Sequence, residues 1–379
     1  MPLASVDQHG SQYCFEDTGP AQSSDYTTLV LVHGACFQAA IFERLFVHAA
    51  AHNMRLVAVN MRDYRGSTPY SASELADLSS ADVARQTAAI RARGLELLTF
   101  ILWLIRTEGI PPLSPASSGN SKGGGGIALL GWSWGNKITL SCVAQASHLS
   151  PDDVETLGRH MRTLILFDPS PRAFGAPASS LEESYNPLND ASLSPEAKQR
   201  VFPDWVSGYY SHSLDGFPSL HRDELLAGFA RDPIANPPPH QSATLHRISS
   251  DEFARIINAD VVARSHLFYE LVDGKVYADN TRVALRSTSI WPNIRVVLVW
   301  CDMSVSETVL PAWGLLRQVQ EDWPTNGRAI HSVRLKGANH FPHWERPKRT
   351  MQLFDDLIRS QRIPEDVEMQ GTEPVYSKL

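Results

Sequence analysis

The sequence predicts an α/β fold with a mostly parallel central sheet, helices on both faces and an inserted cap domain. Three observations support this prediction. Short apolar runs alternate with helical patterns, most of the runs are apolar on both faces, and one long segment interrupts the alternation. The 379 residues, 43% of them hydrophobic, suffice for one large domain with an insertion or for two domains.

The strand patterns set the order of the elements. Residues 12–17 alternate like a half-exposed strand. Continuous apolar runs, typical of strands buried on both faces, cover residues 28–32, 55–59, 127–130, 163–167, 295–300 and 332–335. Helical patterns cover about residues 40–52, 80–108, 136–146, 310–321 and 346–359. The repeating unit is therefore strand, helix, strand.

Two stretches break this alternation. Residues 111–126 are rich in Gly and Ser, which predicts a surface loop that does not pack. The segment from about Pro169 to Pro292 is far longer than a usual connection and carries helical patterns and many aromatic residues, which indicates a cap. The predicted division is a core of 1–168 and 293–361, a cap of 169–292 and a tail of 362–379.

A candidate nucleophile lies in Gly131-Trp-Ser-Trp-Gly135, directly after a buried strand and before a helix. Glycine at both ends allows a tight turn that holds Ser133 at the carboxyl edge of the sheet. There the helix N-terminus favours developing negative charge. The alternative, a turn without chemistry, fits the flanking strand and helix less well.

A serine nucleophile needs a base, and His340 follows the last strand of the predicted core at the same edge of the sheet. We expect His340 to be the general base and later the acid for the leaving group. For the triad acid, Asp168 ends the strand 163–167 and Asp302 follows the strand 295–300. We favour Asp168 and keep Asp302 as the alternative, because Ser304 stands where the later aspartate is expected.

The oxyanion of an acyl intermediate needs two backbone N–H donors. We expect one from Trp134 and the other from Ala35, with the N–H of Cys36 as second choice. The predicted substrate pocket includes the side chains of His33, Cys36, Trp132, Trp205 and His343.

No cofactor or metal is expected, because the chain has no phosphate-binding glycine motif and its four cysteines lack ligand spacing. The net charge of 34 − 41 = −7, without a long basic run, argues against nucleic acid. No run is long enough to span a membrane. The terminal Ser377-Lys378-Leu379 matches the address read by the peroxisomal import receptor, so we expect a protein of the peroxisome matrix, otherwise of the cytoplasm.

Residues 12–361 resemble the α/β-hydrolase superfamily through four motifs: Gly131 to Gly135, Val32-His-Gly-Ala35, Arg62-Asp-Tyr-Arg-Gly66 and Gly337 to Pro347. With Ser-Lys-Leu at the end, the chain is similar to the fungal peroxisomal branch, which includes yeast peroxisomal lipase and hydrolases of toxin biosynthesis. In that branch, as in haloalkane dehalogenases, the acid can follow the earlier strand, which favours Asp168.

The resemblance implies a serine hydrolase. Epoxide hydrolases and dehalogenases of the superfamily carry aspartate where this chain has Ser133, so we expect cleavage of an ester, thioester or lactone through an acyl-serine. The aromatic cap favours a lipophilic acyl or polyketide-like substrate. Two alternatives stay open: an acyltransferase that uses the same acyl-enzyme, and a ligand-binding protein without catalysis.

Overall fold

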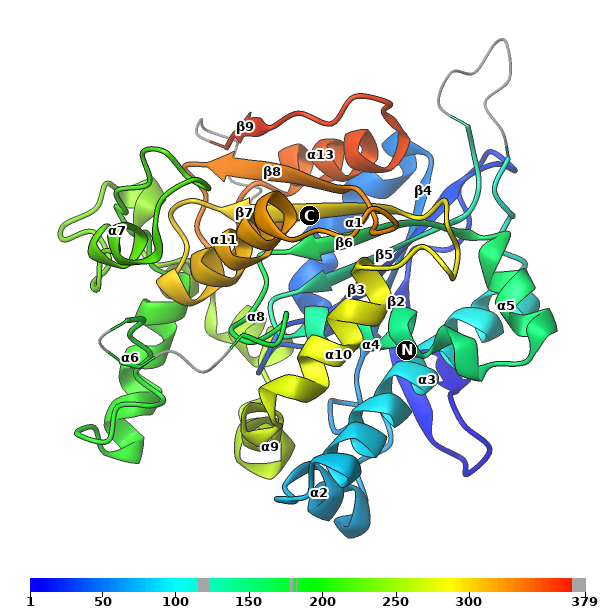
Figure 1. Cartoon of the computed structure of the whole chain (residues 1–379), viewed down its shortest axis with the longest axis horizontal. Helices are drawn as coiled ribbons and strands as arrows, with labels where there is room; N and C mark the ends of the chain where they lie inside the picture. The colour runs from blue at the N-terminus through cyan, green and yellow to red at the C-terminus, as the bar shows by residue number, and fades with distance from the viewer. Residues whose placement is uncertain (115–122, 177–179, 182, 370–379) are drawn as a thin grey trace.

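The computed structural model describes residues 1–114, 123–176, 180–181 and 183–369. In this part of the chain, nine strands form one sheet in the order β1-β2-β4-β3-β5-β6-β7-β8-β9 (Figure 1). Only β1 and β2 pair antiparallel with their neighbours; every other pair is parallel. The strands are β1 Leu3–Ser5, β2 Gln12–Asp17, β3 Thr27–Val32, β4 Met54–Asn60, β5 Ile127–Trp132, β6 Met161–Phe167, β7 Arg295–Cys301, β8 Ile330–Lys336 and β9 Asp366–Glu368.

Two apolar cores lie on the two faces of the sheet. Successive residues of a strand point to opposite faces, so Val30 and Val32 join one core while Leu29 and Leu31 join the other. Figure 1 shows α3, α4 and α10 together on one side of the sheet and α1 with α13 on the other. The predicted fold class, an α/β sheet with helices on both faces, is therefore confirmed.

The α-helices outside the long segment between β6 and β7 follow the predicted pattern, with three additions, α2, α5 and α12. All three span at most about two turns, which is too short to show a clear helical period. The helices are η1 Ala39–Phe42, α1 Glu43–Ala49, η2 Ala50–His52, α2 Ala72–Leu78, α3 Val83–Thr107, α4 Gly135–Gln145, η3 Ala146–His148, α5 Pro151–Gly158, α11 Ser306–Glu321, α12 Pro342–Glu345 and α13 Pro347–Arg359.

The segment between β6 and β7 contributes helices. They are α6 Pro195–Ser207, α7 Arg222–Ala227, η4 Pro239–Gln241, η5 Thr244–Arg247, α8 Ser250–Ile256, η6 Val262–His266, α9 Leu267–Leu271 and α10 Gly274–Leu285. The last of these, α10, packs against α4 in the layer that covers the sheet. The end of the predicted cap, 169–292, thus contributes to the helix layer of the core, while the division into core, cap and tail stays a prediction.

The predicted surface loop 111–126 is only partly described, and its described end is packed. Residues 123–126 are buried, and the N–H of Gly125 donates to the Asp25 carbonyl at 2.6 Å. The N–H of Gly126 donates to the Pro111 carbonyl at 2.8 Å. The expectation that this loop does not pack is wrong for residues 123–126, where the lack of side chains allows close backbone contact rather than free motion.

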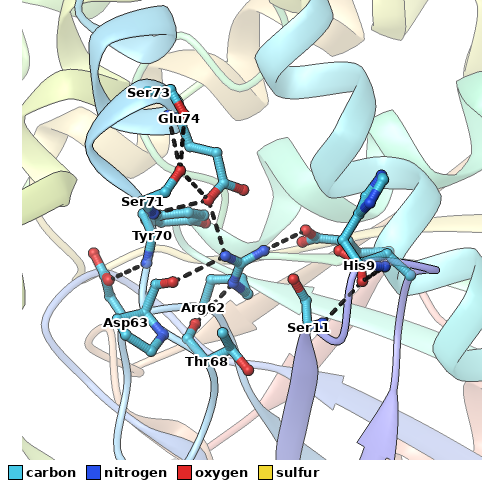
Figure 2. Close-up of polar contacts among 12 residues, drawn as sticks. His9, Ser11, Arg62, Asp63, Thr68, Tyr70, Ser71, Ser73 and Glu74 are labelled. Carbon is cyan, nitrogen blue, oxygen red and sulfur yellow. Dashed lines mark hydrogen bonds and ion pairs between the residues drawn. The ribbon is translucent and has the colours of Figure 1, made fainter.

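A group of four charges, three of them buried, joins the turn after β4 to α2 and α3, and we call it the Arg62 cluster: Arg62, Glu74, Arg93 and Glu96. Arg62 lies 2.7 Å from Glu96 and 3.0 Å from Glu74, and Arg93 lies 2.8 Å from Glu96 and 3.0 Å from Glu74. Figure 2 shows the Arg62 guanidinium between the Glu74 carboxylate and the backbone carbonyl of Thr68, and it donates to both. Each arginine contacts both glutamates, so the charges are balanced inside the cluster.

Two further expectations concern a membrane span and the C-terminal Ser-Lys-Leu motif. Among the helices that the structure describes, none combines the length and the apolar character that crossing a bilayer requires. The Ser377-Lys378-Leu379 motif lies outside the described residues, which end at Met369.

Candidate active site

The turn from β5 into α4 places Ser133 at the carboxyl edge of the sheet. Ser133 has a φ of +54°, a left-handed conformation that non-glycine residues rarely adopt. Its N–H donates to the Phe167 carbonyl at 3.0 Å, which fixes the strained turn to β6. A Cβ on Gly135 would lie 2.5 Å from the Val32 carbonyl oxygen, so only glycine lets α4 start this close to β3. The strain holds a partly exposed serine where a nucleophile can be used.

The loop after β3 approaches Ser133 closely. A Cβ on Gly34 would lie 3.0 Å from Ser133 Cβ, so glycine is needed here for close approach. The N–H of Cys36 donates to the Tyr64 hydroxyl at 3.1 Å, so it is already used. The N–H groups of Ala35 and Trp134 donate to no acceptor within the part of the chain that the structure describes. Of the two predicted alternatives, Ala35 rather than Cys36 therefore has a free donor beside Ser133.

His340 and Asp168 meet at the ends of β8 and β6. His340 Nδ1 lies 2.5 Å from Asp168 Oδ2, and both side chains are buried. Because a carboxylate only accepts, the imidazole donates through Nδ1, which leaves Nε2 as the acceptor that a serine hydroxyl requires. Trp132 Nε1 donates to the His340 carbonyl at 3.1 Å, so the residue before Ser133 also holds the histidine loop.

Asp168 receives two further hydrogen bonds. The Ser304 hydroxyl donates to Asp168 Oδ2 at 2.7 Å, and the Cys301 N–H donates to Oδ1 at 3.0 Å. Thr308 Oγ1 in turn donates to Ser304 Oγ at 2.9 Å. In the sequence, Ser304 stands where the aspartate of the later strand is expected. In the structure, the Ser304 hydroxyl donates to the carboxylate of Asp168, which is the aspartate that contacts His340.

Asp302, the alternative acid, is engaged elsewhere. Its carboxylate accepts from the Gly337 N–H at 2.8 Å and from Arg334 Nε at 3.0 Å. Burial raises the pKa of Asp302, and the Gly337 N–H and Arg334 oppose that rise. Asp302 therefore positions the turn after β8, and the structure brings Asp168 rather than Asp302 to His340.

His33 supports the loop after β3 and has no free nitrogen for a substrate. The side chain is fully buried, and its Nε2 accepts from the Met61 N–H at 3.2 Å. Nδ1 consequently carries the proton and donates to the Gly34 carbonyl at 2.9 Å. Burial lowers the pKa of His33 to about 3, so the ring is neutral at physiological pH. The expected pocket role of His33 is replaced by a positioning role.

The Cys36 thiol is unsuited to nucleophilic chemistry. It is buried, and burial followed by the negative charge of Glu270 raises its pKa to about 12. A thiol with such a pKa carries almost no thiolate at neutral pH. All four cysteines are buried and free.

Three aromatic residues assigned to the pocket by sequence pack inside the protein instead. Trp132 is fully buried between Phe37 and His343. His343 is also fully buried, and neither ring nitrogen has a partner among the described residues. Trp205 in α6 is 8% exposed and donates to the Tyr185 carbonyl at 3.1 Å. Periodicity alone could not distinguish a side chain that faces substrate from one that faces the core.

Within the described residues, no group of His, Cys, Asp or Glu side chains has an arrangement that could hold a metal ion. The polar groups that meet at this edge of the sheet are Ser133, the pair of His340 and Asp168, and the N–H groups of Ala35 and Trp134.

Comparisons with known proteins show the family and the fold. A family model described as "Alpha/beta hydrolase family" matches residues 29–353. A serine hydrolase from a Cycloclasticus bacterium that degrades polyaromatic hydrocarbons is 12% identical, with a TM-score of 0.52 over 94% of this chain and 96% of that one. An esterase from Exiguobacterium antarcticum is 12% identical, with a TM-score of 0.49 over 94% and 99% of the two chains. Potato epoxide hydrolase I is 13% identical, with a TM-score of 0.47 over 94% and 98%.

At these identities the likeness to solved structures concerns the fold alone. No curated protein sequence matches the chain.

Proposed function

The chain belongs to the alpha/beta hydrolase family, and from this premise we propose that it is a serine hydrolase that cleaves a carboxylic ester, thioester or lactone. The observation that carries the proposal is the contact of 2.5 Å between His340 Nδ1 and Asp168 Oδ2, at the sheet edge where the strained turn presents Ser133. This arrangement orients an imidazole base for a serine nucleophile. The family and the fold support a hydrolase in general.

In the proposed mechanism, His340 Nε2 takes the proton of Ser133 as Oγ attacks the carbonyl carbon of the substrate. The N–H groups of Ala35 and Trp134 stabilise the oxyanion of the tetrahedral intermediate. Asp168 stabilises the positive charge that His340 acquires. The imidazolium then protonates the leaving alcohol or thiol, and an acyl-serine remains.

Water then hydrolyses the acyl-serine, and His340 again acts first as a base and then as an acid. His340 takes a proton from water, the hydroxide attacks the acyl carbon, and Ser133 leaves with the proton that His340 returns. A carboxylic acid is released and the enzyme is restored. With an alcohol, amine or thiol in place of water, the same acyl-enzyme would give acyl transfer.

The finer part of the proposal concerns the substrate. We propose a lipophilic acyl or polyketide-like group, supported by the many aromatic residues of the segment 169–292. Membership of the fungal peroxisomal branch, and action in peroxisomal lipid or secondary metabolism, rest on the sequence motifs alone. Fluorescently tagged chains with and without residues 377–379 would test delivery to peroxisomes, and identical distributions of the two chains would contradict it.

Labelling with a fluorophosphonate probe tests the central claim. The purified protein should gain one adduct by intact mass, and Ser133→Ala should gain none, because only an activated serine attacks the phosphorus centre. Thermal unfolding of both proteins controls for folding. A folded wild-type protein that gains no adduct would favour a ligand-binding protein over a hydrolase.

A further inference from the structure

The loop between β3 and η1, residues 33–38, carries the Ala35 N–H that the proposed mechanism uses. A Cβ on Gly34 would lie 3.0 Å from Ser133 Cβ, so this loop passes directly beside the nucleophile turn. An oxyanion donor is effective only when it is aimed at the place where negative charge develops. The residues that fix the conformation of this loop therefore bear on catalysis.

Cys36 has a strained backbone conformation in this loop. Its φ is +68°, in the left-handed region that non-glycine residues rarely adopt. A residue keeps such a conformation only where the surrounding contacts over-determine it, and residues of this kind cluster at active sites. Because Ala35 directly precedes Cys36, relaxation of this φ would redirect the Ala35 backbone as well.

On one side of the loop, the Tyr64 hydroxyl accepts the Cys36 N–H at 3.1 Å. Tyr64 is 2% exposed and lies in the turn after β4, where its own N–H donates to the Met61 carbonyl at 3.1 Å. Its ring packs on the His33 ring, with the ring centres 4.2 Å apart. His33 also accepts the Met61 N–H, so the turn after β4 holds the loop at two points.

On the other side of the loop, residues 256–258 bind it through their backbone. The Asn258 N–H donates to the Cys36 carbonyl at 2.8 Å, and the Gln38 N–H donates to the Ile256 carbonyl at 2.9 Å. The residues between these partners form an isolated antiparallel β-bridge. Residues 256–258 belong to the segment between β6 and β7, so this inserted segment adds a short strand-like contact to the loop.

The two sets of contacts act on the same residue from opposite sides. Tyr64 binds the N–H of Cys36 and Asn258 binds its carbonyl, so Cys36 cannot leave its strained conformation without breaking hydrogen bonds. A buried N–H without an acceptor is costly, which makes the bond to Tyr64 effective in holding the turn. The Ala35 N–H, in contrast, has no acceptor among the described residues and stays available.

We propose that Tyr64 and the backbone of residues 256–258 position the oxyanion site, by holding the strained turn at Cys36 and thereby aiming the Ala35 N–H at the substrate. The inference rests on the serine hydrolase proposed above. It gives the inserted segment a part in stabilising the transition state. Tyr64 acts through the loop and not on the substrate, so its loss should affect kcat more than KM.

Tyr64→Phe removes the acceptor of the Cys36 N–H and keeps the ring. We expect kcat for a nitrophenyl ester to fall about tenfold or more, with KM within about twofold of the wild type. Tyr210→Phe is the matched control, because this buried hydroxyl donates to the Trp205 carbonyl at 2.8 Å, outside the loop, and its loss should leave kcat unchanged. Urea unfolding verifies that both variants are folded. An unchanged kcat in folded Tyr64→Phe would overturn the proposal.

A thionoester separates the aim of the donors from a general structural loss. Sulfur in place of the carbonyl oxygen gives a larger and more weakly accepting anion, which gains less from N–H donors. Tyr64→Phe should therefore lower the ratio of kcat/KM for the ester to that for the thionoester by about fivefold or more. Partial unfolding would reduce both rates equally and leave this ratio unchanged. An unchanged ratio contradicts the positioning role of Tyr64.

Two variants of Asn258 test the other side of the loop with Tyr64 intact. Asn258→Pro removes the N–H that binds the Cys36 carbonyl, and the extended backbone of Ile257, with φ −112° and ψ 141°, is compatible with a following proline. Asn258→Ala removes the same side chain but keeps the N–H. The ester-to-thionoester ratio should be lower in Asn258→Pro than in Asn258→Ala by about threefold or more. Equal ratios would contradict the role of residues 256–258.

The wild type reports the proposed function separately from this inference. If it shows neither fluorophosphonate labelling nor ester turnover, the serine hydrolase fails and the positioning role fails with it. If it shows both, and Tyr64→Phe and Asn258→Pro match Tyr210→Phe and Asn258→Ala, only the positioning role fails.

Discussion

The Arg62 cluster and the Asp168 site both hold buried charged side chains, but their charges are arranged differently. In the Arg62 cluster, two arginines face two glutamates at 2.7 to 3.0 Å. In the Asp168 site, one carboxylate faces a hydroxyl, a backbone N–H and the imidazole of His340, none of which is permanently charged. The positive and negative charges of the Arg62 cluster cancel in the resting protein. The negative charge of Asp168 is cancelled only when His340 is protonated.

The difference predicts a role in stability for the Arg62 cluster and, under the proposed function, a role in catalysis for the Asp168 site. Burial raises the pKa of Glu74, but the Ser71 N–H, Arg93 and Arg62 together lower it to about 2, so Glu74 keeps its charge over the physiological range. Burial raises the pKa of Glu96, against the opposing charges of Arg93 and Arg62. A carboxylate without a fixed cation instead stabilises whatever positive charge arises beside it. We therefore expect the Arg62 cluster to act in stability, whereas the proposed function gives Asp168 a role in catalysis.

The variant with the largest expected effect removes the negative charge of the Asp168 site. Asp168→Asn should lower kcat about 10⁴-fold, because the amide stabilises neither the imidazolium nor the correct tautomer. Steady-state kinetics on a nitrophenyl ester would measure it. Asp302→Asn is the matched control, since its carboxylate binds Arg334 and Gly337. A larger loss of kcat in Asp302→Asn than in Asp168→Asn would reverse the assignment of the acid.

The next largest effect is expected from a variant that removes one negative charge of the Arg62 cluster. Glu96→Gln should lower the free energy of unfolding by about 3–5 kcal/mol, because it leaves buried arginine charge uncompensated. Urea unfolding would measure the loss, and kcat of the folded fraction should change little. Glu155→Gln, in an exposed pair with Arg159, is the control and should cost almost nothing. A loss of kcat without loss of stability would show that the cluster acts on catalysis.

Moving the acid sharpens the comparison. Ser304 Oγ lies 2.7 Å from Asp168 Oδ2, so the two positions meet at nearly the same point in space. The double variant Asp168→Ser with Ser304→Asp should be more active than Asp168→Ser alone by about tenfold or more, because the two sites are directly coupled. Ser304→Asp alone should lose activity through repulsion of two carboxylates. Additive losses in the double variant would show that the acid cannot be moved.

The smallest expected effect concerns a buried group outside both networks. His343 has no hydrogen-bond partner among the described residues, and burial followed by the charge of His340 lowers its pKa well below the usual value. The folded state therefore binds fewer protons than the unfolded state, and stability is lost as the pH falls below about 6.5.

His343→Leu should raise the free energy of unfolding by about 1 kcal/mol at neutral pH, since it removes two unpaired polar atoms. The variant should also lose less stability than the wild type when the pH is lowered from 7 toward 5. Chemical unfolding at several pH values would measure both effects, with the exposed His9→Gln as control. A destabilised His343→Leu would mean that the imidazole has a polar role.

The sequence alone determined the sheet and predicted that Ser133 and His340 lie at its carboxyl edge. Buried parallel strands are continuous apolar runs, and each predicted strand is found within three residues of its predicted ends. The turn at Ser133 depends on glycines next to it in sequence, and His340 follows a strand whose place in the sheet the alternation predicts. These features depend on neighbours along the chain, so a pattern can detect them. Strands β1 and β9 were missed because three residues are too few for a pattern.

Only the tertiary structure decided which aspartate meets His340, which N–H is free, and which pocket residues are buried. Both Asp168 and Asp302 follow strands at the same edge, and the choice depends on Arg334 and Gly337, which bind Asp302. In the same way, the Cys36 N–H donates to the Tyr64 hydroxyl, whereas the Ala35 N–H has no acceptor among the described residues. A hydrogen bond between residues far apart in sequence has no local pattern, because it depends on distances that exist only once the chain has folded.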